Sequence, residues 1–272
     1  MADRSRRSAV IPFVALLLLG LVAGDLARRV LVRPAAVAHQ GAVPLPTASV
    51  PRDTAGLVRE PAGGGGRSMA AAVAPAAALD PASRAAALLR IQREGAETYM
   101  SAMLATADSA LHRWGDDRAA SPVRVAVVRQ TAPGFREVFF ANIGWAITRW
   151  NAVGLPVYLE QVADTTGADI VLTWADRLDS NRAGRADVSW DRSGRLTHVH
   201  VTLATHASDG RQVLPSQMVA LALHELGHAI GLGHSPVAAD ALYPETSAVD
   251  LTARDRRTAL LLYAVPPGNF KH

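Results

Sequence analysis

The chain has 272 residues, of which 49% are apolar, so it is long enough for one folded domain with extensions. Cysteine is absent, which excludes disulfide bonds, thiolate metal sites and a cysteine nucleophile. The formal charge of +4 comes from residues 1–67, which hold nine arginines against four acidic residues. The remainder is near neutral, which excludes a basic face for nucleic acid.

Residues 1–33 have the pattern of an export signal or a membrane anchor. Three arginines precede an uncharged stretch at residues 9–24, and a charged region before an apolar one directs export. The stretch is shorter than the roughly 20 residues of a spanning helix, and Val22-Ala23-Gly24 is only a fair cleavage site. A cleaved signal and an uncleaved anchor therefore both stay open. Either one places the rest of the chain outside the cytosol, secreted or membrane-anchored.

A spacer and a helical segment follow. Residues 34–79 are rich in Ala, Pro and Gly, which predicts a disordered spacer. Asp80 and Pro81 are typical of the N-cap and the first residue of a helix, and they open a helical segment at 80–120. Gly95 is expected to divide this segment into two helices. Its apolar residues recur at helical spacing, and we expect them to pack: Leu88, Ile91, Tyr99, Met103, Ala107 and Leu111.

Residues 121–272 read as an α+β domain with three helices and five strands. One helix has a single apolar face, formed by Phe139, Ile143, Ala146, Ile147 and Trp150. A second opens at Pro215 and runs to about Ile230. A third follows a capping box at Thr252–Asp255 and ends near Tyr263. The strands are expected at residues 123–128, 156–159, 168–174, 185–190 and 196–204, with Asp191–Gly194 as a hairpin turn before the last.

Three histidines and one glutamate on and after the second helix indicate a metal site. His224 and His228 are four residues apart, so both imidazoles can face one ion. Glu225 adjoins His224 and can reach water on the metal without binding the metal itself. Gly231 can take the left-handed conformation that ends a helix, so that His234 returns as a third ligand. Three histidines leave one position open, as a catalytic zinc site requires.

This arrangement predicts metal-assisted amide hydrolysis. Zinc lowers the pKa of its bound water from about 15.7 toward about 7 and polarises the scissile carbonyl. Glu225 would take the water proton as general base and pass it to the leaving amine as general acid. The pattern HExxHxxGxxH at residues 224–234 fixes five positions, which argues against helix histidines that are merely buried.

The chain resembles the matrixins, the metzincin branch that includes the matrix metalloproteinases, and their bacterial relatives, over residues 122–268. The strongest likeness is HELGHAIGLGHS at 224–235. Residues 150–170 resemble the family's helix-to-strand passage, and residues 250–263 resemble its C-terminal helix. The resemblance implies a mixed five-stranded sheet with three helices, a cleft, and a zinc-dependent endopeptidase with metal ligands His224, His228 and His234 and catalytic Glu225.

The chain departs from the family pattern at the floor of the site. Leu242 stands where the matrixin segment ALMYP has methionine. Leucine and methionine are close in volume, so the apolar floor should survive. Pro244-Glu245-Thr246 replaces the family's Pro-x-Tyr. The family pattern therefore does not predict the shape of the specificity pocket in this chain. The cysteine switch of many matrixins is absent, so latency by thiolate ligation is excluded.

The resemblance also raises the question of further metal ions. Matrixins often carry a structural zinc and calcium ions, and His198 and His200 share one face of a strand. The family's ligand patterns for these ions are not matched in this chain. We expect these histidines to be ordinary strand residues, and Asp187 and Asp191 to form turns rather than bind calcium.

Two other functions stay open. One is an enzyme for cell-wall or short peptides, which shares the same chemistry. The other is an exported, membrane-anchored binding module with a vestigial zinc site, supported only by Leu242. The presence of Glu225 argues against it, because metal binding alone does not need that carboxylate. We expect a monomer that acts on protein or peptide substrates, holds an extended substrate at an edge strand near 185–190, and engages a membrane or the export machinery through its N-terminal segment.

Overall fold

The computed structural model describes residues 74–105, 108–129, 132–179 and 181–271. The expected export signal or anchor at 1–33, and the spacer as far as residue 73, lie outside the described residues. Within the described ranges, no helix combines the length and the apolar character needed to cross a membrane.

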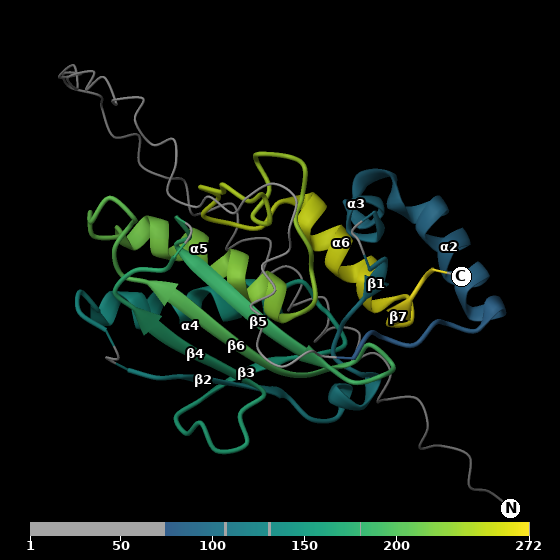
Figure 1. Cartoon of the computed structure of the whole chain (residues 1–272), viewed down its shortest axis with the longest axis horizontal. Coiled ribbons are helices and arrows are strands. Elements are labelled where there is room, and N and C mark those ends of the chain that lie inside the picture. Colours follow the sequence, from purple (N-terminus) through teal and green to yellow (C-terminus); the bar gives the residue numbers. More distant parts are fainter. Residues whose placement is uncertain (1–73, 106–107, 130–131, 180, 272) are drawn as a thin grey trace, which may run out of the picture. The chain divides into compact units, whose positions relative to one another are not determined.

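A mixed five-stranded sheet lies at the centre of the fold (Figure 1). The strand order is β3-β2-β4-β6-β5, with the first four strands parallel and β5 antiparallel to β6. Strand β5 is therefore an edge strand. The predicted α+β fold with a mixed five-stranded sheet is confirmed. The strands are β2 Val123–Val127, β3 Leu159–Val162, β4 Ile170–Ala175, β5 Gly184–Trp190 and β6 Leu196–Ala204.

Three helices correspond to the three expected after residue 121: α4 (Glu137–Asn151), α5 (Pro215–Ala229) and α6 (Ala253–Tyr263). Helices α4 and α5 pack against each other and against the sheet (Figure 1). The five apolar residues predicted on one face of α4 are all buried. One of them, Trp150, donates its indole N–H to the carbonyl oxygen of Leu223 in α5, at 3.0 Å. The capping box at Thr252 and Asp255 is also confirmed.

The helical segment before residue 121 packs into the same core. It comprises α2 Pro81–Glu94, η1 Gly95–Glu97, α3 Met100–Leu104, β1 Ala110–Leu111 and η2 Asp116–Ala119. Asp80 caps α2 as predicted, because Oδ1 accepts from the backbone N–H of Ser83 at 2.9 Å. Strand β1 pairs antiparallel with β7 (Gly268–Asn269), and η1 and α3 lie against α6 (Figure 1).

The predicted helical spacing fails at the end of this segment. Helix α3 ends at Leu104, and Leu111 lies in strand β1 rather than on a helix. Ser109 has a φ of +48°, a left-handed conformation that no α-helix contains. Leu88 is 42% exposed and does not join the core as expected. The apolar spacing misleads here because strand and helix residues both bury apolar side chains.

The predicted strand boundaries differ most from the structure at β3. The strand expected at 156–159 begins at Leu159 and continues to Val162. The backbone N–H of Leu159 donates to Oδ1 of Asn151, and the Asn151 amide donates back to the Leu159 carbonyl, at 2.8 and 2.9 Å. These two bonds hold the chain at the end of α4 until β3 starts, so the residues before Leu159 form the connection.

Candidate metal centre

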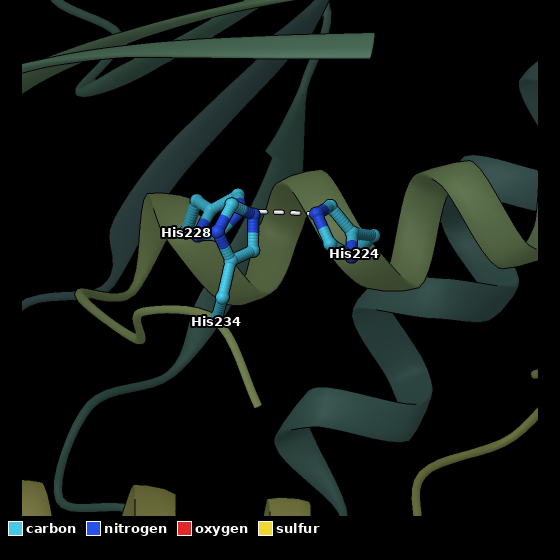
Figure 2. A group of neighbouring side chains, drawn as sticks. All are labelled: His224, His228 and His234. Carbon is cyan, nitrogen blue, oxygen red and sulfur yellow. Dashed lines mark hydrogen bonds between the residues drawn. The ribbon is translucent and has the colours of Figure 1, made fainter. Parts of the chain in front are cut away.

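The three predicted histidines lie together. His224 and His228 project from the same face of α5, and His234 reaches them from the loop that follows the helix (Figure 2). One ligand nitrogen from each ring lies within 4.8 Å of the others. His224 is fully buried, whereas His228 and His234 are half-buried. Among the residues that the structure describes, these three form the cluster placed to share a metal ion.

Backbone carbonyls orient the two helix histidines. Nδ1 of His224 lies 2.8 Å from the carbonyl oxygen of Ala241, and Nδ1 of His228 lies 2.8 Å from that of Leu232. A carbonyl only accepts, so each Nδ1 carries the proton and donates. The proton-free Nε2 atoms then face each other at 3.0 Å (Figure 2). Carbonyl partners of this kind fix the tautomer of metal-binding histidines.

This donor set fits a divalent zinc ion. Zinc–nitrogen bonds of about 2.0–2.1 Å in a tetrahedral site place ligand nitrogens roughly 3.3 Å apart, close to the 3.0 Å between the two Nε2 atoms. Two imidazole lone pairs that face each other repel unless a cation lies between them. Imidazole nitrogen is also a preferred zinc ligand. His224, His228 and His234 are therefore the residues that would hold the ion.

The turn after α5 brings the third histidine back as predicted. Gly231 has a φ of +102°, and its N–H donates to the carbonyl oxygen of His228 at 2.9 Å. The N–H of Leu232 donates to the carbonyl oxygen of Gly227 at 3.0 Å. This turn supplies two parts of the site, because it carries the Leu232 carbonyl that orients His228 and leads directly to His234.

The carboxylate of Glu225 lies against the first residue of the edge strand. Glu225 is 1% exposed. A β-carbon added to Gly184 would overlap Oε1 of Glu225 and lie 2.8 Å from its Cγ and Cδ atoms. Only glycine leaves room for the carboxylate in this position. Sequence reasoning missed Gly184, because nothing in a glycine before a strand indicates which distant side chain lies over it.

Leu242 forms an apolar floor beneath the helix. It is fully buried, and a β-carbon on Gly227 would lie 2.8 Å from its Cδ2 atom. Its neighbour Ala241 donates its N–H to Oδ2 of Asp255 in α6 at 3.0 Å. Helix α6 thus anchors the loop whose Ala241 carbonyl orients His224.

The other candidate ligands have structural partners. Oδ1 of Asp191 accepts from the N–H groups of Ser193 and Arg195, at 2.8 and 3.0 Å, and forms the hairpin turn as predicted. Asp187 does not form a turn as expected, because it lies within strand β5, where it pairs with Arg185 at 2.9 Å.

The strand histidines differ in their surroundings. His198 is exposed. Nε2 of His200 lies 3.2 Å from the hydroxyl of Thr173, and burial lowers the pKa of His200.

Comparison with known proteins places this site in a family. The matrixin family profile matches residues 122–264, more than half of the chain. The chain belongs to the matrixin family. This matrixin is similar to metalloendoproteinase 1-MMP of Arabidopsis thaliana, with 32% identity over 136 residues. That match covers 45% of the chain but only 37% of the plant protein. The family suggests a zinc-dependent endopeptidase, and the histidine triad can hold its metal.

Proposed function

We propose that this protein is a zinc-dependent endopeptidase with ligands His224, His228 and His234 and with Glu225 as general base. The observation that carries the proposal is the convergence of three histidine nitrogens within 4.8 Å of one another. Glu225, the residue after the first ligand, provides a carboxylate on the same helix. Family membership supports the same chemistry.

The chain's own residues account for the proton transfers. When bound, zinc would supply Lewis acidity, which acidifies water and polarises the scissile carbonyl. Glu225 takes a proton from the attacking water and then gives it to the leaving amine nitrogen. The low exposure of Glu225 keeps competing solvent away from its carboxylate. The carbonyls of Ala241 and Leu232 hold the two helix imidazoles in the tautomer that leaves Nε2 able to bind.

We also propose that an extended peptide binds along β5. This strand pairs with β6 on one side only and begins at Gly184, beside Glu225. An extended peptide can add to such an edge through main-chain hydrogen bonds. The peptide bond to be cleaved would then lie close to the carboxylate. The side-chain preference depends on the loop at residues 244–246, which departs from the matrixin pattern.

Hydrolysis of a quenched fluorescent peptide library by the full chain tests the proposal. Wild type is expected to hold about one zinc ion per chain and to cleave peptides. Glu225→Ala should retain the zinc but lose at least about a hundredfold of kcat/KM. The matched control is Glu160→Ala, which changes an exposed glutamate in β3 and should leave both quantities unchanged. Cleavage by Glu225→Ala at the wild-type rate would contradict the role of Glu225.

The same measurement separates the enzyme from a binding module. A protein that binds zinc but cleaves no peptide in the library would support the exported, membrane-anchored module instead. The sole support for that alternative was Leu242 in place of the family's methionine. Leu242 fills the floor of the site, so the described residues do not favour the alternative.

The sequence pattern of residues 1–33 supports export, and we propose that the protease domain acts outside the cytosol. Fusing these residues to a reporter enzyme that is active only after export tests the proposal. Reporter activity that depends on the three arginines and on the apolar stretch would support it. A fusion protein that is produced in full but shows no reporter activity would contradict it.

A further inference from the structure

Residues from the helical segment before residue 121 contact the end of the histidine-bearing helix. The indole N–H of Trp114 donates to the carbonyl oxygen of Ala229, the last residue of α5, at 3.0 Å. The carbonyl oxygen of His112 occupies the space that a β-carbon on Gly231 would need. A larger residue at 231 would thus meet backbone rather than a movable side chain. The two contacts fall on the last residue of α5 and on the turn that leads to His234.

A third contact from the same segment lies next to His234. A β-carbon on Gly233 would lie 3.1 Å from Cγ of Met103, a residue of α3. Met103 and Trp114 are 6% and 2% exposed, so both are held within the core. From helix α6, Tyr263 donates its hydroxyl to the carbonyl oxygen of Ile230 at 3.0 Å. Burial raises the pKa of Tyr263, which keeps that donor protonated.

The contacts of His112, Trp114 and Met103 come from outside the part of the chain that matches the family. The matrixin profile begins at residue 122, whereas Met103 and Trp114 precede it. The segment is tied to the domain at both of its ends. Strand β1 pairs with β7, and the N–H of Tyr99 lies 3.2 Å from Oγ1 of Thr258 in α6. The turn after α5 is therefore held in place by chain that lies before the matched region.

We propose that residues 99–105 and 108–114 form a positioning element of the metal centre, in which Trp114 and Met103 hold the turn Gly231–Gly233 so that His234 reaches the metal. The inference rests on the zinc site of the proposed function. This role is the opposite of that of an inhibitory segment, whose removal from the site would activate the enzyme. Loosening the segment should weaken zinc binding rather than release activity.

Zinc affinity of the full chain, measured by competition with a chromogenic chelator, tests this role. Trp114→Phe keeps an aromatic ring but removes the donor to Ala229. Its zinc dissociation constant should rise about tenfold. This is the lower end of the range observed when residues that orient metal ligands are replaced. Trp145→Phe, which alters a tryptophan of α4 that is 40% exposed, is the control and should bind zinc like wild type. An unchanged dissociation constant for Trp114→Phe would overturn the inference.

A thermodynamic cycle distinguishes positioning of His234 from general loosening of the fold. If Trp114 acts through the turn, the tenfold effect of Trp114→Phe should largely disappear in a His234→Ala background. A tenfold effect that persists in that background would overturn the inference. Should Trp114→Phe fail to fold, Met103→Ala, which removes the side chain against Gly233, undergoes the same cycle with the same expectation.

The outcomes also separate this inference from the proposed function. Wild-type protein that binds no zinc would overturn both. Zinc binding of equal affinity in wild type, Trp114→Phe and Met103→Ala would overturn the positioning role and leave the proposed zinc site standing.

Discussion

Gly184 and Glu225 lie in contact, with no room for a β-carbon on Gly184 beneath the carboxylate. The contact joins the start of edge strand β5 to helix α5, so it sets the distance between the proposed general base and the strand proposed to hold the substrate. Any side chain at residue 184 must displace either the strand or the carboxylate.

Replacing Gly184 by alanine should therefore impair catalysis without removing the metal. We expect kcat to fall by at least about tenfold, because general acid–base catalysis depends on the position of the carboxylate. The zinc dissociation constant should stay within about twofold of wild type, since the three atoms nearest to the new methyl group all belong to Glu225 rather than to a histidine. Gly95→Ala, where a β-carbon meets only ordinary contacts at 3.6 Å or more, is the control. Full activity of Gly184→Ala would show that the Glu225 carboxylate moves freely.

Leu242→Met restores the residue of the matrixin pattern and should change little. Leucine and methionine have similar volumes, and such exchanges in a core usually cost less than about 1.5 kcal/mol. Leu242→Ala should instead reduce the free energy of unfolding by roughly 2–5 kcal/mol, because it opens a cavity under Gly227. Denaturant unfolding measures both changes. A gain of tenfold or more in activity for Leu242→Met would contradict the expectation, because it would mean that leucine impairs the site.

Two neighbouring prolines in β5 should have different effects. The N–H of Ala204 donates to the carbonyl oxygen of Ala183, and bonded pairs alternate along an antiparallel ladder. Counting alternate pairs from Ala183, Ser189 and His198 form a hydrogen-bonded pair, whereas Val188 and Val199 do not. The backbone of Ser189 is therefore hydrogen-bonded to β6. The N–H of Val188 then points to the open edge.

Val188→Pro should accordingly raise KM by about tenfold while the fold remains stable, since it removes only an outward donor. Ser189→Pro should instead lower the melting temperature, because it removes a ladder bond. Peptide kinetics and thermal unfolding of the two variants measure the difference. If Val188→Pro leaves KM unchanged, the substrate does not pair with β5 at this residue.

Stability should depend on pH through His200. Burial lowers the pKa of this histidine below its ordinary value of 6.5, so near and below pH 6.5 the unfolded chain binds more protons at this residue than the folded one. The contribution of His200 is present above that pH and is lost as the pH falls. His200→Gln should therefore lose less stability than wild type between pH 7.5 and pH 5.5. Denaturant unfolding across this range provides the comparison, and equal slopes for the two proteins would contradict the prediction.

Local features of the sequence predicted much of the fold and the clustering of the three histidines. The buried face of α4, the capping box at Thr252 and the turn at Gly231 all depend on residues a few positions apart. The histidine pattern also lies within eleven residues, so the geometry of helix α5 and the turn at Gly231 bring its members together.

Contacts between distant parts of the chain could not be predicted in this way. Gly184 meets Glu225 across 41 positions, and Trp114 meets Ala229 across 115. Leu111 has the spacing of a helix but pairs with Gly268 in a strand that forms only after the chain has folded. The spacing of apolar residues indicates which side chains are buried. These long-range contacts depend instead on how whole helices and strands pack against one another.

The most direct test of the zinc assignment is diffraction from crystals of the full chain on both sides of the zinc absorption edge. We expect one strong anomalous peak, about 2.0–2.1 Å from an imidazole nitrogen of each of His224, His228 and His234. A folded protein with no peak at these three histidines, or with its zinc bound elsewhere, would contradict the proposed metal centre.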